Sequence, residues 1–201
     1  MRERHCTSPG QRSFSDLLVL LHQELSAANV DHAFGGALAL AFHVVRARAT
    51  EDIDLSVSAS SKKVSDVFRA LPAGVKGDGR SVKIAETTGA VKLRWFRGIS
   101  VNLFFPTNDF LRLALNRAET HRYQGVGLPF ITATDLTVLK ATFNRGTDIG
   151  GKEKDWLDIR MMLEAGTPDV KDAMAWIERL EGPNSSALQK LSALAQETMT
   201  Q

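Results

Sequence analysis

The chain has 201 residues, which suits one domain or one domain with a helical extension. Apolar residues make up 43% and charged residues 24%, enough for a real core and a soluble surface. No stretch approaches the roughly 18 consecutive apolar residues of a membrane span, and the N-terminal segment lacks the apolar core of a signal peptide. The one cysteine, Cys6, excludes an internal disulfide and fits a reducing compartment, so we expect a cytoplasmic protein with no membrane partner. The net charge of +2 permits a nucleic-acid partner without requiring one.

Helices and strands alternate in the first two thirds of the chain. Leucines at helical spacing predict a helix that is capped by Ser13 or Ser15 and ends near residue 29. In chain order we then expect a strand (30–34), a small-residue helix (37–45), a strand (52–57) and a helix ending at residue 71. Three strand-like runs follow (81–87, 90–96 and 99–105), joined by turn residues at 88–89 and 97–98 that indicate hairpins. A helix to about residue 118 and an extended connector over 123–130 complete this part.

The pattern after residue 131 is helical. Thr134 is expected to cap a helix that ends at residue 144, and Thr167-Pro168 to start one that ends at residue 181. Two more helices are expected, over 154–164 and 185–198. The predicted fold class is therefore α+β: a small mixed sheet flanked by helices (1–131), followed by a helical C-terminal part (132–201).

The stretch with the clearest chemistry runs from residue 34 to residue 57. Gly35 and Gly36 open an apolar helix, where backbone N–H groups can approach a phosphate. Asp52 and Asp54 stand two residues apart on a predicted strand and therefore point to the same face. Two like charges on one strand face repel unless a cation lies between them. A phosphate cradle beside a divalent-cation site indicates chemistry on a nucleoside triphosphate (NTP).

These residues resemble a known fold. Gly35-Gly36 at a helix start followed by Asp52-Ile53-Asp54 on a strand resembles the nucleotidyltransferase fold of the DNA polymerase β superfamily. The later stretch Asp135-Leu136-Thr137-Val138-Leu139-Lys140, then Arg145 and Lys154-Asp155-Trp156-Leu157-Asp158, is similar to the bacterial AbiEii/MenA-type branch. That branch contains the toxin halves of toxin–antitoxin pairs. The resemblance covers roughly residues 31–163.

The resemblance implies a role for each matching position. Gly35 and Gly36 would hold the triphosphate, Asp52 and Asp54 would hold Mg²⁺, and Lys140 would reach the nucleotide phosphates. The late motif would contribute three more residues to the nucleotide site, namely Lys154, Asp155 and Asp158. The catalytic set would be Asp52, Asp54, Asn102 and Lys140.

The sequence departs from the family at three points. Many members have Gly-Ser where this chain has Gly35-Gly36, and the loop before Asp52 is longer than usual. The third carboxylate of the family falls on Asn102 when the strand over 99–105 is aligned. An amide oxygen can bind a hard cation, but it carries no charge and cannot act as a base at neutral pH. Loss of a positioned base costs about 10²–10⁴-fold in rate.

The leading hypothesis is a Mg²⁺-dependent transfer of a nucleoside monophosphate from an NTP to an acceptor. The resemblance implies a tRNA 3′ end, a protein hydroxyl or a small molecule as acceptor, and a cognate antitoxin as partner. The alternative is an inactive or weak nucleotide-binding or protein-binding module, which Asn102 favours. An aminoglycoside-type modifier is a third reading, although it usually needs an acidic acceptor pocket and the residues after 150 are of mixed charge.

Several basic side chains allow two readings from sequence. Lys92 and Arg94 alternate along a strand and form either a solvated face or a basic floor for phosphates. Arg46 and Arg48 serve either loop solubility or contact with a nucleic-acid backbone. Lys154 and Asp158 have the spacing of a surface ion pair. Lys140 either extends along an apolar helix face to solvent or points into the site. His43 is expected to pack in the core.

Overall fold

The computed structural model describes residues 13–58, 63–95, 98–143 and 148–199. The first half contains α1 (Phe14–Ala27), β1 (His32–Phe34), α2 (Gly36–His43), β2 (Asp52–Val57), α3 (Val64–Ala70), α4 (Gly79–Thr88), β3 (Ala90–Arg94) and β4 (Ser100–Phe104). The second half contains α5 (Asp109–Asn116), β5 (Glu119–Tyr123), β6 (Val126–Phe130), α6 (Ala133–Thr142), α7 (Ile149–Glu164), α8 (Val170–Glu181) and α9 (Ser186–Met199).

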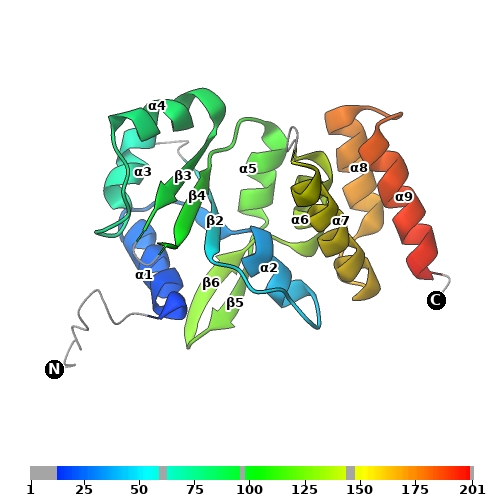
Figure 1. The fold of residues 1–201 in the computed structure, drawn as a ribbon, viewed down its shortest axis with the longest axis horizontal. Coiled ribbons are helices and arrows are strands. Elements are labelled where there is room, and N and C mark those ends of the chain that lie inside the picture. The colour runs from blue at the N-terminus through cyan, green and yellow to red at the C-terminus, as the bar shows by residue number, and fades with distance from the viewer. Residues whose placement is uncertain (1–12, 59–62, 96–97, 144–147, 200–201) are drawn as a thin grey trace.

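The strands form one mixed sheet in the order β3-β4-β2-β1-β6-β5. The pair β2–β4 is parallel, whereas β3–β4, β1–β2 and β5–β6 are antiparallel. Figure 1 shows α3 and α4 beside β3 and β4 at one end of the molecule, and α6 to α9 gathered at the other end. The α+β class with a small mixed sheet flanked by helices is confirmed.

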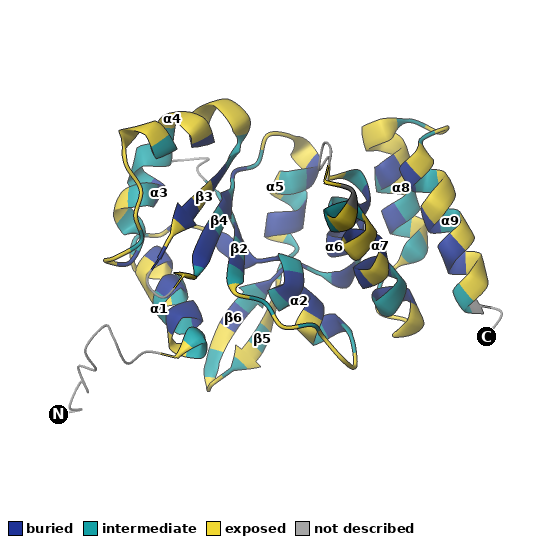
Figure 2. Ribbon diagram, viewed as in Figure 1, coloured by how far each residue is buried: buried dark blue, intermediate teal, exposed yellow. Residues whose placement is uncertain are grey.

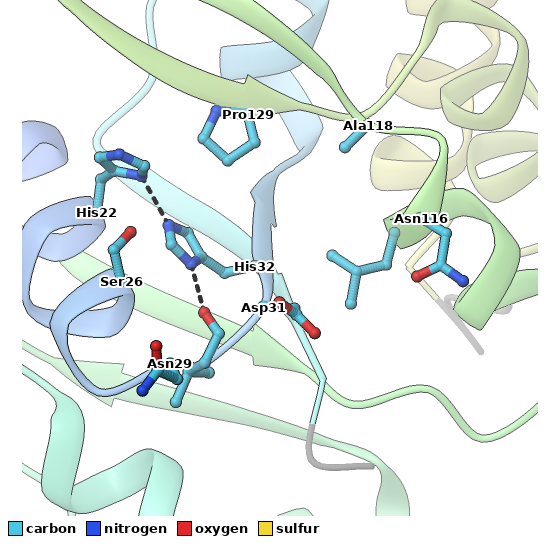
Figure 3. A pocket seen from close by; sticks show the side chains of 10 residues that line it. His22, Ser26, Asn29, Asp31, His32, Asn116, Ala118 and Pro129 are labelled. Carbon is cyan, nitrogen blue, oxygen red and sulfur yellow. Dashed lines mark hydrogen bonds between the residues drawn. The ribbon is translucent and has the colours of Figure 1, made fainter. Parts of the chain in front are cut away.

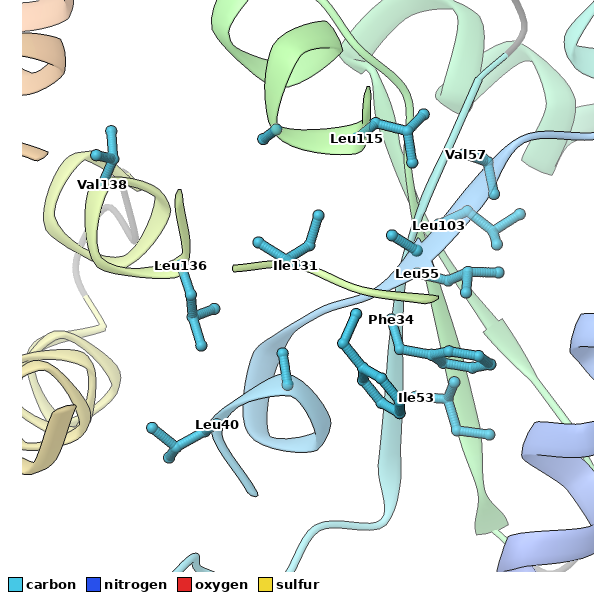
Figure 4. Packing of buried hydrophobic residues seen from close by; sticks show 14 of the residues in the cluster. Phe34, Leu40, Ile53, Leu55, Val57, Leu103, Leu115, Ile131, Leu136 and Val138 are labelled. Carbon is cyan, nitrogen blue, oxygen red and sulfur yellow. The ribbon is translucent and has the colours of Figure 1, made fainter. Parts of the chain in front are cut away.

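One cluster of buried apolar side chains runs from α1 to α9. The strands place Phe34, Ile53, Leu55 and Leu103 at its centre, each fully or almost fully buried. Figure 4 shows Ile131, at the end of β6, between this group and Leu136 of α6. Figure 2 shows the same distribution, with the buried residues on the inner sides of the helices and along the sheet. The boundary near residue 131 coincides with the end of the last strand, and it stays a prediction.

The strand expected over 81–87 is wrong, because these residues belong to α4. Alternating Val82 and Ile84 suggested a strand, but both ends of the segment carry helix signals. Asp78 Oδ1 accepts a hydrogen bond of 2.8 Å from the Ser81 N–H, and Gly89 ends the helix in a left-handed conformation with φ 72°. The residues expected to form a hairpin turn at 88–89 are therefore the end of a helix. Strands β3 and β4 are confirmed and pair antiparallel.

The connector expected over 123–130 is instead the second strand of a hairpin, with β5 as the first. Gln124 and Gly125 at its turn have φ values of 49° and 80°, as a two-residue hairpin turn requires. The expected helix to residue 118 ends at Asn116, which frees Glu119 for β5.

Three helix starts also differ from expectation, and one of them is that α7 begins at Ile149 and not at residue 154. Thr132, not Thr134, caps α6 by accepting a hydrogen bond of 3.1 Å from the Asp135 N–H. Asp169, rather than Thr167, caps α8. Thr134 instead accepts a hydrogen bond of 2.9 Å from the Asp169 N–H, so it connects α6 to α8.

An ion-pair cluster attaches the helical part to the end of α5. Arg117 pairs with Asp135, which is fully buried, and donates to Asp172 of α8 over 3.1 Å. These three residues come from three segments, so the cluster fixes α6 and α8 relative to the sheet. Within the described ranges, each helix is too short or too polar to cross a membrane.

Candidate active site

Three neighbouring strands present a regular grid of side chains on one face of the sheet. Register pairs Asp54 of β2 with Asn102 of β4, and Asn102 with Lys92 of β3. The next row away from the start of β2 contains Ser56, Phe104 and Ala90, and the row at the start of β2 contains Asp52, Ser100 and Arg94. The intervening residues of β2, including Ile53 and Leu55, are fully buried on the opposite face. Asp52 and Asp54 therefore share the face that is not committed to the core.

Gly36 lies against the carboxylate of Asp54. Its φ of +53° is in the left-handed region, and a Cβ added there would lie 1.8 Å from Asp54 Oδ2. Gly35 is extended and donates its N–H to the Asp54 carbonyl over 2.9 Å. The double glycine thus brings the start of α2 directly beside Asp54. The N-cap residue of α2 is Gly35, which has no side chain to accept hydrogen bonds from the N–H groups of the first turn.

Asp54 is partly buried beneath this turn. Asn102 Nδ2 donates to Asp54 Oδ1 over 2.7 Å. Burial raises the pKa of the Asp54 carboxyl above its ordinary value; the bond from Asn102 acts in the opposite direction, and the charge of Asp52 raises the pKa further. The positive charges of Lys140 and Arg48 act in the direction that lowers the pKa of Asp54.

Asp52 is more exposed than Asp54 and has a different partner. Lys92 Nζ donates to Asp52 Oδ1 over 3.2 Å, and both side chains are about half exposed, at 61% for Lys92 and 47% for Asp52. Lys92 therefore faces the paired carboxylates rather than only solvent. An exposed pair of this kind is worth little energy and opens easily.

A buried ionic cluster from α6 and α7 stands near Asp54. Lys140 Nζ lies 3.0 Å from Asp155 Oδ1 and 2.7 Å from Asp158 Oδ2. Both acids are almost fully buried, and the Lys140 side chain is 7% exposed. Lys140 thus points inward to charged groups and does not extend to solvent.

Arg48 joins this cluster from the loop between α2 and β2. Its Nε and Nη2 donate to the two oxygens of Asp158, each over 3.2 Å. Asp158 is fully buried, so its charge is balanced by two cations from distant segments. The surface ion pair between Lys154 and Asp158 does not form: Asp158 is bound by Arg48 and Lys140, and Lys154 is exposed on α7.

The structure brings most of the predicted residues together. Close around Asp54 lie Gly35, Gly36, Asp52, Asn102 and Lys140, with Asp155 and Asp158 bound to Lys140. Lys154 is exposed on α7, and Arg145 of the resembling motif lies outside the described residues. His43 is buried, and its Nε2 donates to the Ile131 carbonyl over 2.8 Å, so it is a packed residue as expected.

Sequence reasoning missed the pairing of Arg48 with Asp158. These residues are 110 positions apart, and only the fold places the α2–β2 loop against α7. The signal available from sequence was one arginine shortly before the paired acids, which is too common a pattern to identify a partner.

The donor set around Asp54 fits a divalent cation. Within the described ranges, no three His, Cys, Asp or Glu side chains group so as to hold a metal ion. Mg²⁺, however, is commonly bound by one or two carboxylates together with substrate phosphates. Asp52 and Asp54 repel each other on one face, and burial penalises the charge of Asp54; a cation would relieve both effects.

A separate groove of about 560 Å³ lies near the start of β1, away from Gly35 and Gly36. Figure 3 shows His22 and His32 next to each other in its lining, joined by a hydrogen bond. His32 Nδ1 donates to the Val30 carbonyl over 2.8 Å, so its Nε2 accepts from His22 Nδ1 over 3.0 Å. The two rings thus form a hydrogen bond with each other. Neither Asp52 nor Asp54 lines this groove.

The sheet, the glycine-opened helix and the paired acids define a class of protein. An antigenic nucleotidyltransferase-like protein from Paracoccidioides brasiliensis has a similar crystal structure, with 21% identity, a TM-score of 0.50, and coverage of 88% of this chain and 92% of its own. The solution structure of the antibiotic-resistance factor ANT(2'')-Ia is also similar, with 8% identity, a TM-score of 0.51, and coverage of 93% and 97%. At these identities the likeness shows the fold, which is that of the nucleotidyltransferases.

The family follows from the sequence. Residues 19–191 match the family described as nucleotidyl transferase AbiEii toxin of type IV toxin–antitoxin systems. The chain belongs to this AbiEii family and is a nucleotidyltransferase. A search of curated protein sequences gives no match to this chain.

Proposed function

We propose that this protein is a Mg²⁺-dependent toxin that transfers a nucleoside monophosphate from an NTP to a hydroxyl acceptor. The acceptor oxygen forms a bond to the α-phosphorus, the bond between the α- and β-phosphates breaks, and pyrophosphate leaves. The acceptor proton passes to solvent, because Asn102 cannot take it at neutral pH. The observation that carries this proposal is the position of Asp52 and Asp54 on one open face beside the glycine-opened start of α2.

Each group has a distinct task in this proposal. Asp52 and Asp54 would hold Mg²⁺, which when bound neutralises phosphate charge in an in-line displacement. Backbone N–H groups at the start of α2 would bind the triphosphate, with Gly36 allowing the close approach. Lys140 would bind a phosphate oxygen, and Asp155 and Asp158 hold its ammonium group in place.

Charge balance supports the role of a metal in this proposal. Among the described residues, the cations Lys140 and Arg48 stand beside the carboxylates of Asp54, Asp155 and Asp158. These carboxylates would disfavour a bare triphosphate. A divalent cation held by Asp52 and Asp54 would add two positive charges to the site and so attract the triphosphate.

The setting follows from the family. An AbiEii-type toxin implies a cognate antitoxin, and we place the reaction in the cytoplasm. We keep three acceptor classes: a tRNA 3′ end, a protein hydroxyl and a small molecule. Incubation of a cell extract with radiolabelled NTPs would identify the class, because labelled RNA, protein and small molecules separate by size.

The test of the proposal is label transfer by variants of the paired acids. Asp52→Ala and Asp54→Ala should each abolish transfer, because each removes half of the cation site. Asp109→Ala is the matched control: this acid is 90% exposed at the start of α5 and pairs only locally with Arg112. Full transfer by the two site variants would refute the assignment.

Asn102 supports a second candidate function, a nucleotide-binding module without turnover. Calorimetry that shows binding of Mg·ATP by a protein inactive on every acceptor pool would favour this candidate. For an enzyme, Asn102→Asp should raise the rate, since it supplies the missing carboxylate. The same variant sets two carboxylates where a hydrogen bond of 2.7 Å now lies, so its melting temperature should fall without Mg²⁺ and recover with it.

A further inference from the structure

Two aromatic side chains, Phe104 and Phe143, meet beside the ionic groups of the site. Phe104 follows Asn102 by two residues on the same face of β4, and Phe143 follows Lys140 by three residues at the end of α6. Their rings make an edge-to-face contact, with centroids 6.3 Å apart and planes at 87°. We call these two residues the aromatic pair.

Two different elements lead from the ionic groups to the aromatic pair. Along β4, two residues advance the chain by roughly 7 Å from Asn102 to Phe104. Along α6, three residues advance it by roughly 4.5 Å from Lys140 to Phe143. Both β4 and α6 line the proposed site. The aromatic pair therefore follows directly after Asn102 along β4 and after Lys140 along α6.

The aromatic pair has ring surface to offer. Phe104 is only partly buried, and its register neighbours on the adjacent strands are the small residues Ser56 and Ala90. Phe143 is 45% exposed. Its backbone is held in place by Lys152, whose Nζ donates to the Phe143 carbonyl over 3.0 Å.

We propose that the aromatic pair is the stacking site for the base of the donor nucleotide. This inference rests on the proposed function, since it places the triphosphate at Gly36, Asp54 and Lys140. With the phosphates there, the ribose spans the step from Asn102 to Phe104 and the base lies on the aromatic pair. Every base has a π-face, so such a site binds purine and pyrimidine nucleotides without reading their edges.

The experiment compares two ligands that differ only in the nucleoside. Calorimetry with Mg·ATP and with Mg·tripolyphosphate is run on the full chain, on Phe143→Leu and on Phe104→Leu. Both variants keep an apolar side chain and lose the aromatic face. Ile84→Ala is the control, because Ile84 is 41% exposed on α4 and lies outside the site.

The expected result is selective. Each aromatic variant should bind Mg·ATP about five- to a hundredfold more weakly, the range for loss of one stacking contact, while its affinity for Mg·tripolyphosphate stays unchanged. Mg·CTP and Mg·GTP should lose affinity as Mg·ATP does. The control should bind all ligands as the unchanged chain does.

Other results would overturn the inference. If both variants bound Mg·ATP as tightly as the unchanged chain does, the aromatic pair would not be the base-binding site. A raised KM for the acceptor in a transfer assay would not alter that conclusion. Equal losses for ATP and tripolyphosphate would show a structural effect instead. If the unchanged chain bound neither Mg·ATP nor Mg·tripolyphosphate, the proposed function itself would be wrong. If it bound both with equal affinity, only the assignment of the aromatic pair as the base site would be wrong.

Discussion

Gly36→Ser is an informative substitution, because sequence and structure make opposite predictions for it. The resemblance to the nucleotidyltransferase fold implies that a serine is often found at this position, where its hydroxyl would add a phosphate contact. In this chain Gly36 has φ +53°, and the added Cβ would lie 1.8 Å from Asp54 Oδ2 and 3.1 Å from Asp54 Cβ. We therefore expect the serine to reduce activity.

Two effects set the magnitude. A left-handed conformation costs an L-residue about 1–2 kcal/mol relative to glycine. For a chain of this size that corresponds to a fall in melting temperature of roughly 2–8 °C. The clash adds a second effect, since the carboxylate of Asp54 must turn away, which breaks its bond from Asn102 and disturbs the cation site.

Thermal unfolding and label transfer measure the two effects separately. Gly35→Ala is the matched control, because Gly35 is not left-handed and its added Cβ would meet its nearest atom, Ile131 Cγ1, at 3.9 Å. The control should keep its melting temperature within a few degrees. If Gly36→Ser melted as the unchanged chain does and transferred label at least as fast, the close approach of Gly36 to Asp54 would be wrong.

Two further predictions concern buried charge. Asp158→Ala leaves Lys140 and Arg48 without a shared counter-ion, so it should lower the free energy of unfolding by about 3–5 kcal/mol in denaturant titrations; a loss as small as that of Glu153→Ala, an exposed acid on the same helix, would contradict this. Burial lowers the pKa of His32 below its ordinary value, so the unfolded chain binds the extra proton first, and the free energy of unfolding should fall as the pH drops below about 6.5. His32→Gln should reduce that fall between about pH 7 and pH 5, and an unchanged pH dependence would exclude His32 as its source.

Asn102 is the residue at which the candidate site lacks the carboxylate that the resemblance leads us to expect. In the grid it occupies the position between Asp54 and Lys92, where a third carboxylate would complete the cation site. Its amide satisfies Asp54 in the structure and lowers the cost of burying that acid. The amide therefore stabilises the buried carboxylate of Asp54, but it would leave the proposed cation with one negative charge fewer than a third carboxylate would give.

The sequence by itself determined the local part of the site. The double glycine and the alternation of Asp52 and Asp54 with buried aliphatic residues depend on neighbours along the chain, and β2 has the predicted bounds. Local patterns gave the wrong prediction for α4, where an apparent alternation of apolar residues suggested a strand. The capping residues Asp78 and Gly89 instead mark the two ends of a helix. The hairpin of β5 and β6 was missed because β5 (Glu119–Tyr123) is mostly polar and exposed, although Val126, Leu128 and Phe130 alternate along β6.

Only the tertiary structure decided which charges meet. Arg48 and Asp158, Asn102 and Asp54, and the aromatic pair each join segments that are far apart in the sequence. The physical reason is that a buried charge needs a partner at contact distance, and the choice of partner depends on how the helices pack on the sheet. The sequence predicts Lys140 as a site residue, whereas its pairing with Asp155 and Asp158 is visible only in the packed structure.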